Sequence, residues 1–398
     1  MATISRPAER PRAALDPIKW LRENLFSSWI NTLLTFVSLA ILWLVASNLL
    51  DWIFTQAKWA VVTQNLRLFM VGRYPQAELW RVWICLLAVV FLFGTSWGTW
   101  GGIFRSISAL LASGLLILAL LPFSLQTRAW LVGAVFVLAG GFVLSTRVVR
   151  LRGGTVVLAW LLSFPAVIVL LRGLAPTAPL LPAISTSLWG GLLLTLLLAV
   201  VGIVAAFPIG ILLAIGRRSK LPVVKMFSIV YIEMIRGVPL ITILFMSSIM
   251  VPLFLPENIR VDRVIRAMVG LVIFSAAYLA ENVRGGLQAV PRGQEEAAVA
   301  LGLSPTLTMG LIILPQALRA VIPAIVGQFI SLFKDTSLVA IVGLLELLGI
   351  ARAVVAQPEF LGLQREVFLF IAAVYWIFSY TMSYASRRLE VALGVGQR

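Results

Sequence analysis

The sequence predicts an all-α polytopic membrane protein with about ten transmembrane helices. Hydrophobic residues make up 61% of the 398 residues and charged residues only 12%, and the mean hydropathy is +1.02. A soluble domain carries about 25% charged residues. The apolar residues are also grouped in runs of about 20, which is the length that a helix needs to cross the hydrocarbon core.

Ten runs meet this length criterion, and we expect each of them to form one membrane-crossing helix. In chain order they are 28–50, 82–104, 106–125, 129–146, 155–172, 187–215, 226–252, 264–284, 311–333 and 366–386. The second and third share a Gly- and Trp-rich stretch, 93–106, whose composition suits an interfacial segment. A further apolar run, 336–350, is too short to span, so we expect a re-entrant or surface helix that is covered by protein.

The composition of the chain divides it into three regions. Residues 1–27 are polar, 28–173 contain five predicted spans, and 187–388 contain five more. The division between the two sets of spans lies at a cluster of prolines, because prolines at this density end helices and stiffen a connection. These prolines are Pro176, Pro179 and Pro182.

Several function classes lack the residues that they need. The chain has no His and a single Cys, Cys85, which argues against zinc sites, Cys–His nucleophiles and disulfide frameworks. It has no phosphate-binding G-x-x-x-x-G-K-[ST] loop and no protease or acyl-transfer motif. The net charge of +16 is spread between apolar runs instead of forming one stripe, so we expect contact with membrane lipid and not with nucleic acid.

The connection 285–315, between two predicted spans, contains the most informative pattern. A run of alanines after Glu296 favours helix. Gly302 is suited to the left-handed conformation that ends a helix, and Ser304 is placed to cap the next helix, which would begin at Pro305. We therefore expect two short helices joined by a bend on one membrane face, a shape that a groove in a partner can receive. The alternative is an ordinary amphipathic loop.

The spacing Glu-Ala-Ala-x3-Gly-x9-Ile-x-Leu-Pro in this connection resembles the cytoplasmic coupling loop of ABC-importer permeases of the binding-protein-dependent type. The residues that carry the match are Glu296, Ala297, Ala298, Gly302, Ile312, Leu314 and Pro315. Segments 233–239, 276–298 and 314–338 are similar to polar amino-acid permeases of the same family. The match extends over 187–388, about half the chain, and the whole chain looks like the long permease subunits of general L-amino-acid importers.

This resemblance implies a five-helix permease core preceded by five extra spans. The implied activity is import of polar or general L-amino acids by alternating access. ATP and Mg²⁺ are expected in a separate dimer of ATPase subunits that binds the coupling loop, so this chain is expected to be no enzyme and to hold no cofactor. The other implied partners are a second homologous permease, or a second copy of this chain, and an extracytoplasmic amino-acid-binding protein.

Charged residues stand inside or near the predicted spans, where charge is costly. Glu233 and Arg236 are three residues apart and share a helix face, so they can pair near Pro239. A simple ion pair and a gating role are both open for them. Glu281 and Arg284 repeat this spacing at the end of their span, where an anchor at the membrane boundary is favoured over a gate.

The residues Lys334 to Ser337 form the other polar group. Adjacent residues of a helix do not face one another, so we expect the helix to break at Lys334 and Asp335, with Thr336 and Ser337 capping the next segment. With Gln328 two turns earlier, these side chains are candidates to bind the ammonium and carboxylate of an amino acid. The alternative is a turn at the outer interface with Lys334 extended toward water.

Lys and Arg are more numerous in the connections on the side of the coupling loop than on the other side. By the positive-inside rule we expect that side, with both termini, to be cytoplasmic in a bacterial inner membrane. Two other functions stay open. One is a secondary amino-acid transporter driven by an ion gradient, for which Glu281 and Asp335 are the candidate coupling carboxylates. The other is a membrane enzyme or scaffold, which is disfavoured because no loop combines a nucleophile, a base and a donor.

Overall fold

The computed structural model describes residues 17–121, 123–149, 151–256 and 258–394, and within them the regular structure is helical, with isolated bridges but no strand. Most of the predicted tail, residues 1–16, lies outside the described residues. The chain forms two compact units, Met1–Trp59 and Ala60–Arg398. The predicted division at 173–187 falls inside the second unit, and the separation of an N-terminal extension from a permease core stays a prediction.

The first unit contains α1 (Pro17–Asn24), α2 (Trp29–Asp51) and the π-helical turn η1 (Trp52–Gln56). Ser28 caps α2 through its Oγ, which accepts a hydrogen bond from the Asn31 N–H at 3.2 Å. No described residue of α2 is buried, although the helix is apolar on all sides. Such a helix is typical of a span that faces lipid.

The first part of the second unit is a bundle in which α5 packs against three other long helices. Its elements are α3 (Ala60–Gln64), α4 (Leu66–Val71), η2 (Gln76–Glu78), α5 (Leu79–Trp100), α6 (Gly102–Leu120), α7 (Leu125–Val143), η3 (Leu144–Val148), α8 (Gly153–Arg172) and η4 (Thr186–Leu188). Helix α5 runs through the first part of the Gly- and Trp-rich stretch to Trp100, and α6 begins at Gly102 after a break at Gly101, so the interfacial position of this stretch stays a prediction. Gly94 lets α5 approach α7 closely, since a Cβ there would lie 2.1 Å from the Leu138 carbonyl oxygen.

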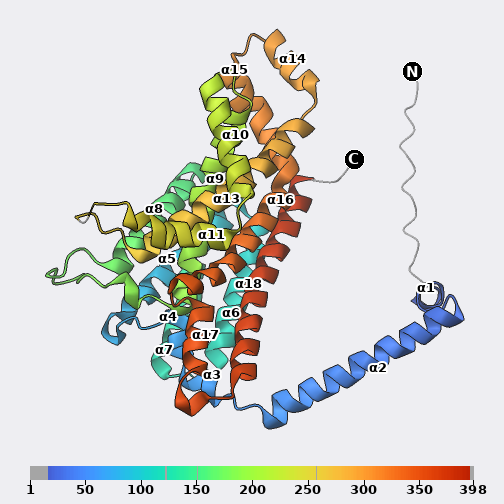
Figure 1. Ribbon diagram of the computed structural model, residues 1–398, viewed down its shortest axis with the longest axis vertical. Helices are drawn as coiled ribbons and strands as arrows, with labels where there is room; N and C mark the ends of the chain where they lie inside the picture. Colours follow the sequence, from blue (N-terminus) through green and yellow to red (C-terminus); the bar gives the residue numbers. More distant parts are fainter. Residues whose placement is uncertain (1–16, 122, 150, 257, 395–398) are drawn as a thin grey trace. The chain divides into compact units, whose positions relative to one another are not determined.

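The second part of this unit is arranged around α13, which packs along α9 and α16 and also contacts α10 and α11 (Figure 1). Its elements are α9 (Gly191–Arg217), α10 (Pro222–Arg236), α11 (Leu240–Phe245), η5 (Met246–Met250), α12 (Val251–Leu253), α13 (Arg263–Ala289), α14 (Arg292–Ala300), α15 (Pro305–Leu307), η6 (Thr308–Ile313), α16 (Leu314–Asp335), η7 (Thr336–Val342), α17 (Leu347–Val355), η8 (Pro358–Phe360) and α18 (Gln364–Leu393).

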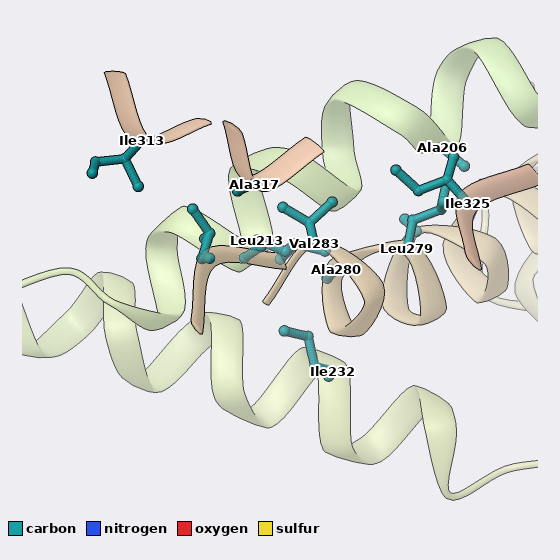
Figure 2. Packing of buried hydrophobic residues seen from close by; sticks show 12 residues of the cluster. Ala206, Leu213, Ile232, Leu279, Ala280, Val283, Ile313, Ala317 and Ile325 are labelled. Carbon is teal, nitrogen blue, oxygen red and sulfur yellow. The ribbon is translucent and has the colours of Figure 1, made fainter. Parts of the chain in front are cut away.

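One buried apolar cluster joins four of these helices. Leu213 of α9, Ile232 of α10, Val283 of α13 and Ala317 of α16 all belong to it (Figure 2). Many members are alanines, which keeps the helix axes close together, and close approach is the usual means of helix association in a bilayer.

Each of the ten predicted spans has a helical counterpart. The described residues contain nine helices that are long and apolar enough to cross a membrane, and ten if one bent pair counts as a span. The bent pair corrects the seventh predicted span: α10 and α11 meet at 107° and do not form one helix. The chain turns there because Pro239 disfavours a helical conformation for the residue before it.

The predicted short helix at 336–350 is two elements. A 3₁₀ segment, η7, follows α16, and α17 begins only at Leu347. Gly343, at φ +81°, ends the first element in the left-handed conformation. The predicted span 264–284 also extends beyond its predicted end, because α13 reaches Ala289 and so includes Gly285.

The closeness of α13 and α16 generates a prediction with a matched control. A Cβ on Gly286 would lie 2.4 Å from the Ala317 carbonyl oxygen, whereas a Cβ on Gly285 would meet no atom within 4 Å. Gly286→Ala should therefore destabilise the protein, by about 1–3 kcal/mol for an overpacked site. Gly285→Ala should be neutral or stabilising, because alanine favours helix. Thermal midpoints of the two detergent-solubilised variants measure the difference, and equal midpoints would contradict the packing described here.

Candidate coupling and gating sites

The predicted coupling segment lies at one end of the second unit, where α14 and α15 extend beyond the neighbouring helices (Figure 1). Helix α14 ends in a Schellman motif: the Leu303 N–H donates to the Ala298 carbonyl at 3.1 Å, and the Gly302 N–H donates to the Val299 carbonyl at 2.9 Å. Gly302 has φ +74°, as expected from the sequence. Ser304 caps α15, since its Oγ accepts from the Leu307 N–H.

The surface of this segment combines acidic and apolar side chains. Glu296 and Ala297 are exposed, while Ala298 is buried against the protein. Val299 is 65% exposed and Leu301 81% exposed, although both belong to a polar connection. These side chains are available for contact with a partner.

The other predicted coupling residues lie farther along the chain. Ile312 is in η6, and Leu314 and Pro315 begin α16. The start of α16 is tied to α14 by a hydrogen bond of 3.2 Å from Gln316 Nε2 to Gln294 Oε1. The Ile-x-Leu-Pro part of the motif therefore continues directly into a span.

A cluster of charged side chains joins α9, α10 and α13, and Glu281 is its centre. Its carboxylate is bound by Arg284, one turn later on α13, with 2.9 Å between Arg284 Nε and Glu281 Oε2. Arg236 Nη1 of α10 lies 3.6 Å from the same oxygen, and Arg217 Nη1 of α9 lies 3.8 Å from it. The predicted pairing of Glu281 with Arg284 is confirmed as a contact.

The predicted pair of Glu233 and Arg236 is wrong. Among the described residues, Glu233 Oε1 binds Arg217 Nη1 at 2.8 Å, and Arg236 reaches Glu281. Both partners belong to other helices. The packing of α10 on α9 and α13 brings an oppositely charged side chain of another helix beside each of these two residues. Arg236 also lies over the Tyr278 ring, 5.7 Å from its centre.

The ion pairs of this cluster differ in strength. The Glu233 side chain is more than half exposed, so its pair contributes about 0–1 kcal/mol. Glu281 is more enclosed and meets three guanidinium groups, where two unit charges 4 Å apart interact by about 4 kcal/mol at an effective dielectric of about 20. Glu281 is thus the side chain that ties the three helices together at this end.

The predicted substrate residues lie at the other end of α16. We expected the helix to break at Lys334 and Asp335; the α-helix ends at Asp335, but the chain continues without a break as the 3₁₀ segment η7. Thr336 is buried and donates its hydroxyl hydrogen to the Phe333 carbonyl at 2.6 Å; it is the C-cap residue of α16 and does not cap the next segment, whose N-cap is Asp335. Asp335 and Lys334 make no ion pair with any residue that the structure describes. Gln328 lies seven residues before Asp335 on the same face of α16.

The sequence reasoning missed Glu346, which caps α17. Its carboxylate is fully buried and accepts hydrogen bonds from the Leu348 and Gly349 N–H groups, both at 2.8 Å. The Tyr375 hydroxyl of α18 donates to it at 3.2 Å. Next to it, the Leu347 N–H donates to Thr195 Oγ1 of α9. The sequence signal that could have identified this residue is the presence of a single acidic side chain within the apolar run 336–350.

Burial raises the pKa of Glu346 to about 7, although three donors and the nearby Arg352 favour its charged form. The folded carboxyl therefore keeps a proton that the unfolded one has released, between pH values of about 4.5 and 7. Its contribution to stability is present at low pH and is lost as the pH rises through this window, by about 3 kcal/mol at most.

We accordingly expect the thermal midpoint of the wild-type protein to fall between pH 5 and pH 8 more steeply than that of Glu346→Gln, which cannot titrate. Glu359→Gln is the control, because Glu359 is exposed. Detergent-solubilised proteins in a fluorescence melting assay are suitable for the comparison. Parallel pH profiles for the wild type and Glu346→Gln would show that this carboxyl does not titrate in the window.

Comparison with known proteins identifies the family to which this chain belongs. The family described as "Binding-protein-dependent transport system inner membrane component" matches residues 206–393. The inner membrane amino-acid ABC transporter permease protein YhdY of Escherichia coli is 39% identical over 393 residues, which are 95% of this chain and 93% of YhdY. The glutamate/glutamine/aspartate/asparagine transport system permease protein BztC of Rhodobacter capsulatus is 38% identical over 421 residues, with 96% and 95% covered.

Among solved structures, a crystal structure of an amino acid ABC transporter with histidines is 30% identical to the matched part. It covers 51% of this chain and 92% of its own, with a TM-score of 0.46. The two long relatives match almost the whole chain, including the five spans before the matched family region. The chain therefore belongs to the family of binding-protein-dependent inner-membrane transport components, as a multi-pass permease subunit of the amino-acid ABC transporter type.

Proposed function

We propose that this permease subunit imports polar or general L-amino acids by alternating access, driven by ATP hydrolysis in a separate ATPase subunit. The observation that carries the proposal is the coupling segment, in which α14 and its C-cap residue Leu301 present Glu296, Val299 and Leu301 at the surface. The similarity to YhdY and BztC supports ATP-driven import over transport driven by an ion gradient.

In this proposal, partner proteins supply the energy for transport. A dimer of ATPase subunits binds ATP and Mg²⁺, and one subunit receives α14 of this chain in a surface groove. A second homologous permease, or a second copy of this chain, completes the membrane part. An extracytoplasmic binding protein delivers the amino acid. The bias of Lys and Arg supports a cytoplasmic position for the coupling segment and both termini.

In this proposal, the charge cluster links movement of the coupling helix α14 to the membrane-spanning helices. Helix α14 follows α13 after Val290 and Pro291, and Glu281 holds α13 to α9 and α10 near the same end. A displacement of α14 therefore acts on the helix that the cluster holds. We propose that Glu233, Arg236, Pro239, Glu281 and Arg284 form the cytoplasmic gate, with Arg217 as a further member.

The proposed substrates are inferred from the relatives. BztC is named for glutamate, glutamine, aspartate and asparagine, and all of these carry an ammonium and at least one carboxylate. We propose that Asp335 binds the ammonium and Lys334 a carboxylate, with Gln328, Thr336 and Ser337 as further substrate-binding residues. The free charges of Asp335 and Lys334 within the described structure favour this role over an internal ion pair.

Substitution of Asp335 tests the substrate site. Asp335→Ala should raise the substrate concentration that gives half-maximal uptake at least tenfold, because the ammonium loses its counter-charge, while ATPase binding is retained. Glu359→Ala, at an exposed acidic position, is the control. Competition uptake with a panel of amino acids measures the change. An unaltered profile in Asp335→Ala would assign Asp335 a structural role.

The coupling interaction is tested by pull-down of the tagged chain from solubilised membranes. Wild type should recover an ATPase subunit and a permease, and Glu296→Lys/Gly302→Asp should lose the ATPase while it keeps the permease. The control is Glu359→Lys/Gly362→Asp, because Gly362 also has positive φ, +87°, and open space around it. The control should behave like wild type.

Two outcomes would contradict the proposal. If wild type recovers no ATPase under conditions that preserve complexes, the coupling motif has another role, and ion-driven transport becomes the leading hypothesis. If both double variants lose the ATPase equally, the loss reflects general damage and α14 is not the docking segment.

A further inference from the structure

A basic pocket lies where the coupling helix joins the spans, and the proposed transport mechanism assigns no role to two of its arginines, Arg218 and Arg292. The pocket has a volume of about 430 Å³ and lies between the ends of α9 and α13 and the start of α14. Its charged lining residues are Arg217, Arg218, Arg284, Arg292 and Glu295. Leu287, Val290 and Ile313 form its apolar part.

The pocket contains positive charge that the protein does not neutralise. Arg217 and Arg284 are held by the carboxylates of Glu233 and Glu281. Arg218 donates a hydrogen bond to the Leu287 carbonyl at 3.5 Å, and neither it nor Arg292 makes an ion pair with any described residue.

The pocket also offers hydrogen-bond donors that suit an anion. A guanidinium group presents a planar set of donors that fits phosphate or carboxylate in a bidentate manner. The N-terminus of α14 opens at the same place, and its cap residue, Pro291, supplies no side-chain acceptor. The free N–H groups and the helix dipole add to the attraction for negative charge. The single carboxylate among the described lining residues is Glu295.

The surroundings of the pocket indicate where the anion comes from. The chain leaving Arg218 continues with Lys220 and Leu221 before α10, and Val223 lies in the first turn of that helix; these side chains are exposed, Val223 by 73%. Lys225 lies in the first turn of that helix. A cluster of basic residues beside exposed aliphatic side chains at the end of a span is the pattern that binds acidic lipid headgroups at the cytoplasmic surface.

We propose that this pocket binds the headgroup phosphate of an acidic phospholipid from the cytoplasmic leaflet, with Arg218 and Arg292 as its principal ligands. The aliphatic side chains beside Lys220 receive the start of the acyl chains. The assignment of the leaflet rests on the proposed function, because it requires the coupling segment to be cytoplasmic. Since Arg292 begins α14, a bound lipid fixes the base of the coupling helix against α9.

The test is native mass spectrometry of the delipidated full chain, titrated with phosphatidylglycerol or with phosphatidylcholine. Wild type should bind at least fivefold more phosphatidylglycerol than phosphatidylcholine. Arg218→Gln/Arg292→Gln should lose this preference, and the single variant Arg218→Gln should reduce it, which keeps the test valid if the double variant folds poorly. Arg319→Gln is the matched control, because Arg319 is exposed near the start of α16 and lies outside the pocket lining.

Three results would overturn the proposal. The first is equal binding of the two lipids by wild type, and the second is a preference that survives in Arg218→Gln/Arg292→Gln. The third is full displacement of phosphatidylglycerol by inorganic phosphate at equal concentration, which would assign the pocket to a small soluble anion.

Pull-down of the ATPase with the same variants separates this proposal from the proposed function. Retention of the ATPase by Arg218→Gln/Arg292→Gln together with loss of the lipid preference supports the lipid site. Loss of the ATPase with an unchanged lipid preference would instead assign the pocket to the ATPase interface and overturn the lipid proposal.

Discussion

The close packing of α13 between α9 and α16 is the constraint on which the rest of the structure depends. Gly286 brings the backbone of α13 against the Ala317 carbonyl, and alanines along α13 and α16 keep the remaining separation small. In a bilayer, this kind of contact replaces the hydrophobic effect as the source of helix association. The packing fixes the ends of the helices, and those ends carry the chemistry: Arg217 ends α9, Glu281 and Arg284 lie in the last turns of α13, and α14 follows α13 after a two-residue turn.

Three features therefore meet at one end of the second unit: the charge cluster, the basic pocket and the coupling segment. Arg217 and Arg284 belong to both the cluster and the pocket, so the carboxylate of Glu281 and a bound anion would act on the same guanidinium groups. In the proposed mechanism, the ATPase moves α14, and α14 is joined to α13 through the chain and to α16 through Gln294 and Gln316. The proposed docking segment and the proposed gate are thus joined through the chain and through one hydrogen bond.

Local signals in the sequence made part of the fold and of the candidate site predictable. The length of the apolar runs located the spans, and Gly302 and Ser304 marked the ends of short helices because their conformations are set by neighbouring residues. The errors concern partners that are distant in sequence. The spacing of Glu233 and Arg236 suggested a pair, but the packing of α10 gives each of them a partner on another helix. The bend before Pro239 is an exception, because its signal is local: a proline disfavours the helical conformation for the residue before it, but the apolar residues on both sides suggested one span. Glu346 is surrounded by residues from α9, α17 and α18, which no local pattern reveals.

The most direct test of the central claim is uptake of a labelled amino acid into proteoliposomes that contain the chain, its permease partner and the ATPase recovered with it. With the amino-acid-binding protein added on the opposite side, uptake should require ATP and Mg²⁺ on the side of the ATPase and should continue when an uncoupler removes ion gradients. Uptake by the membrane subunits alone that is abolished by the uncoupler would contradict the account and would show that an ion gradient drives this protein.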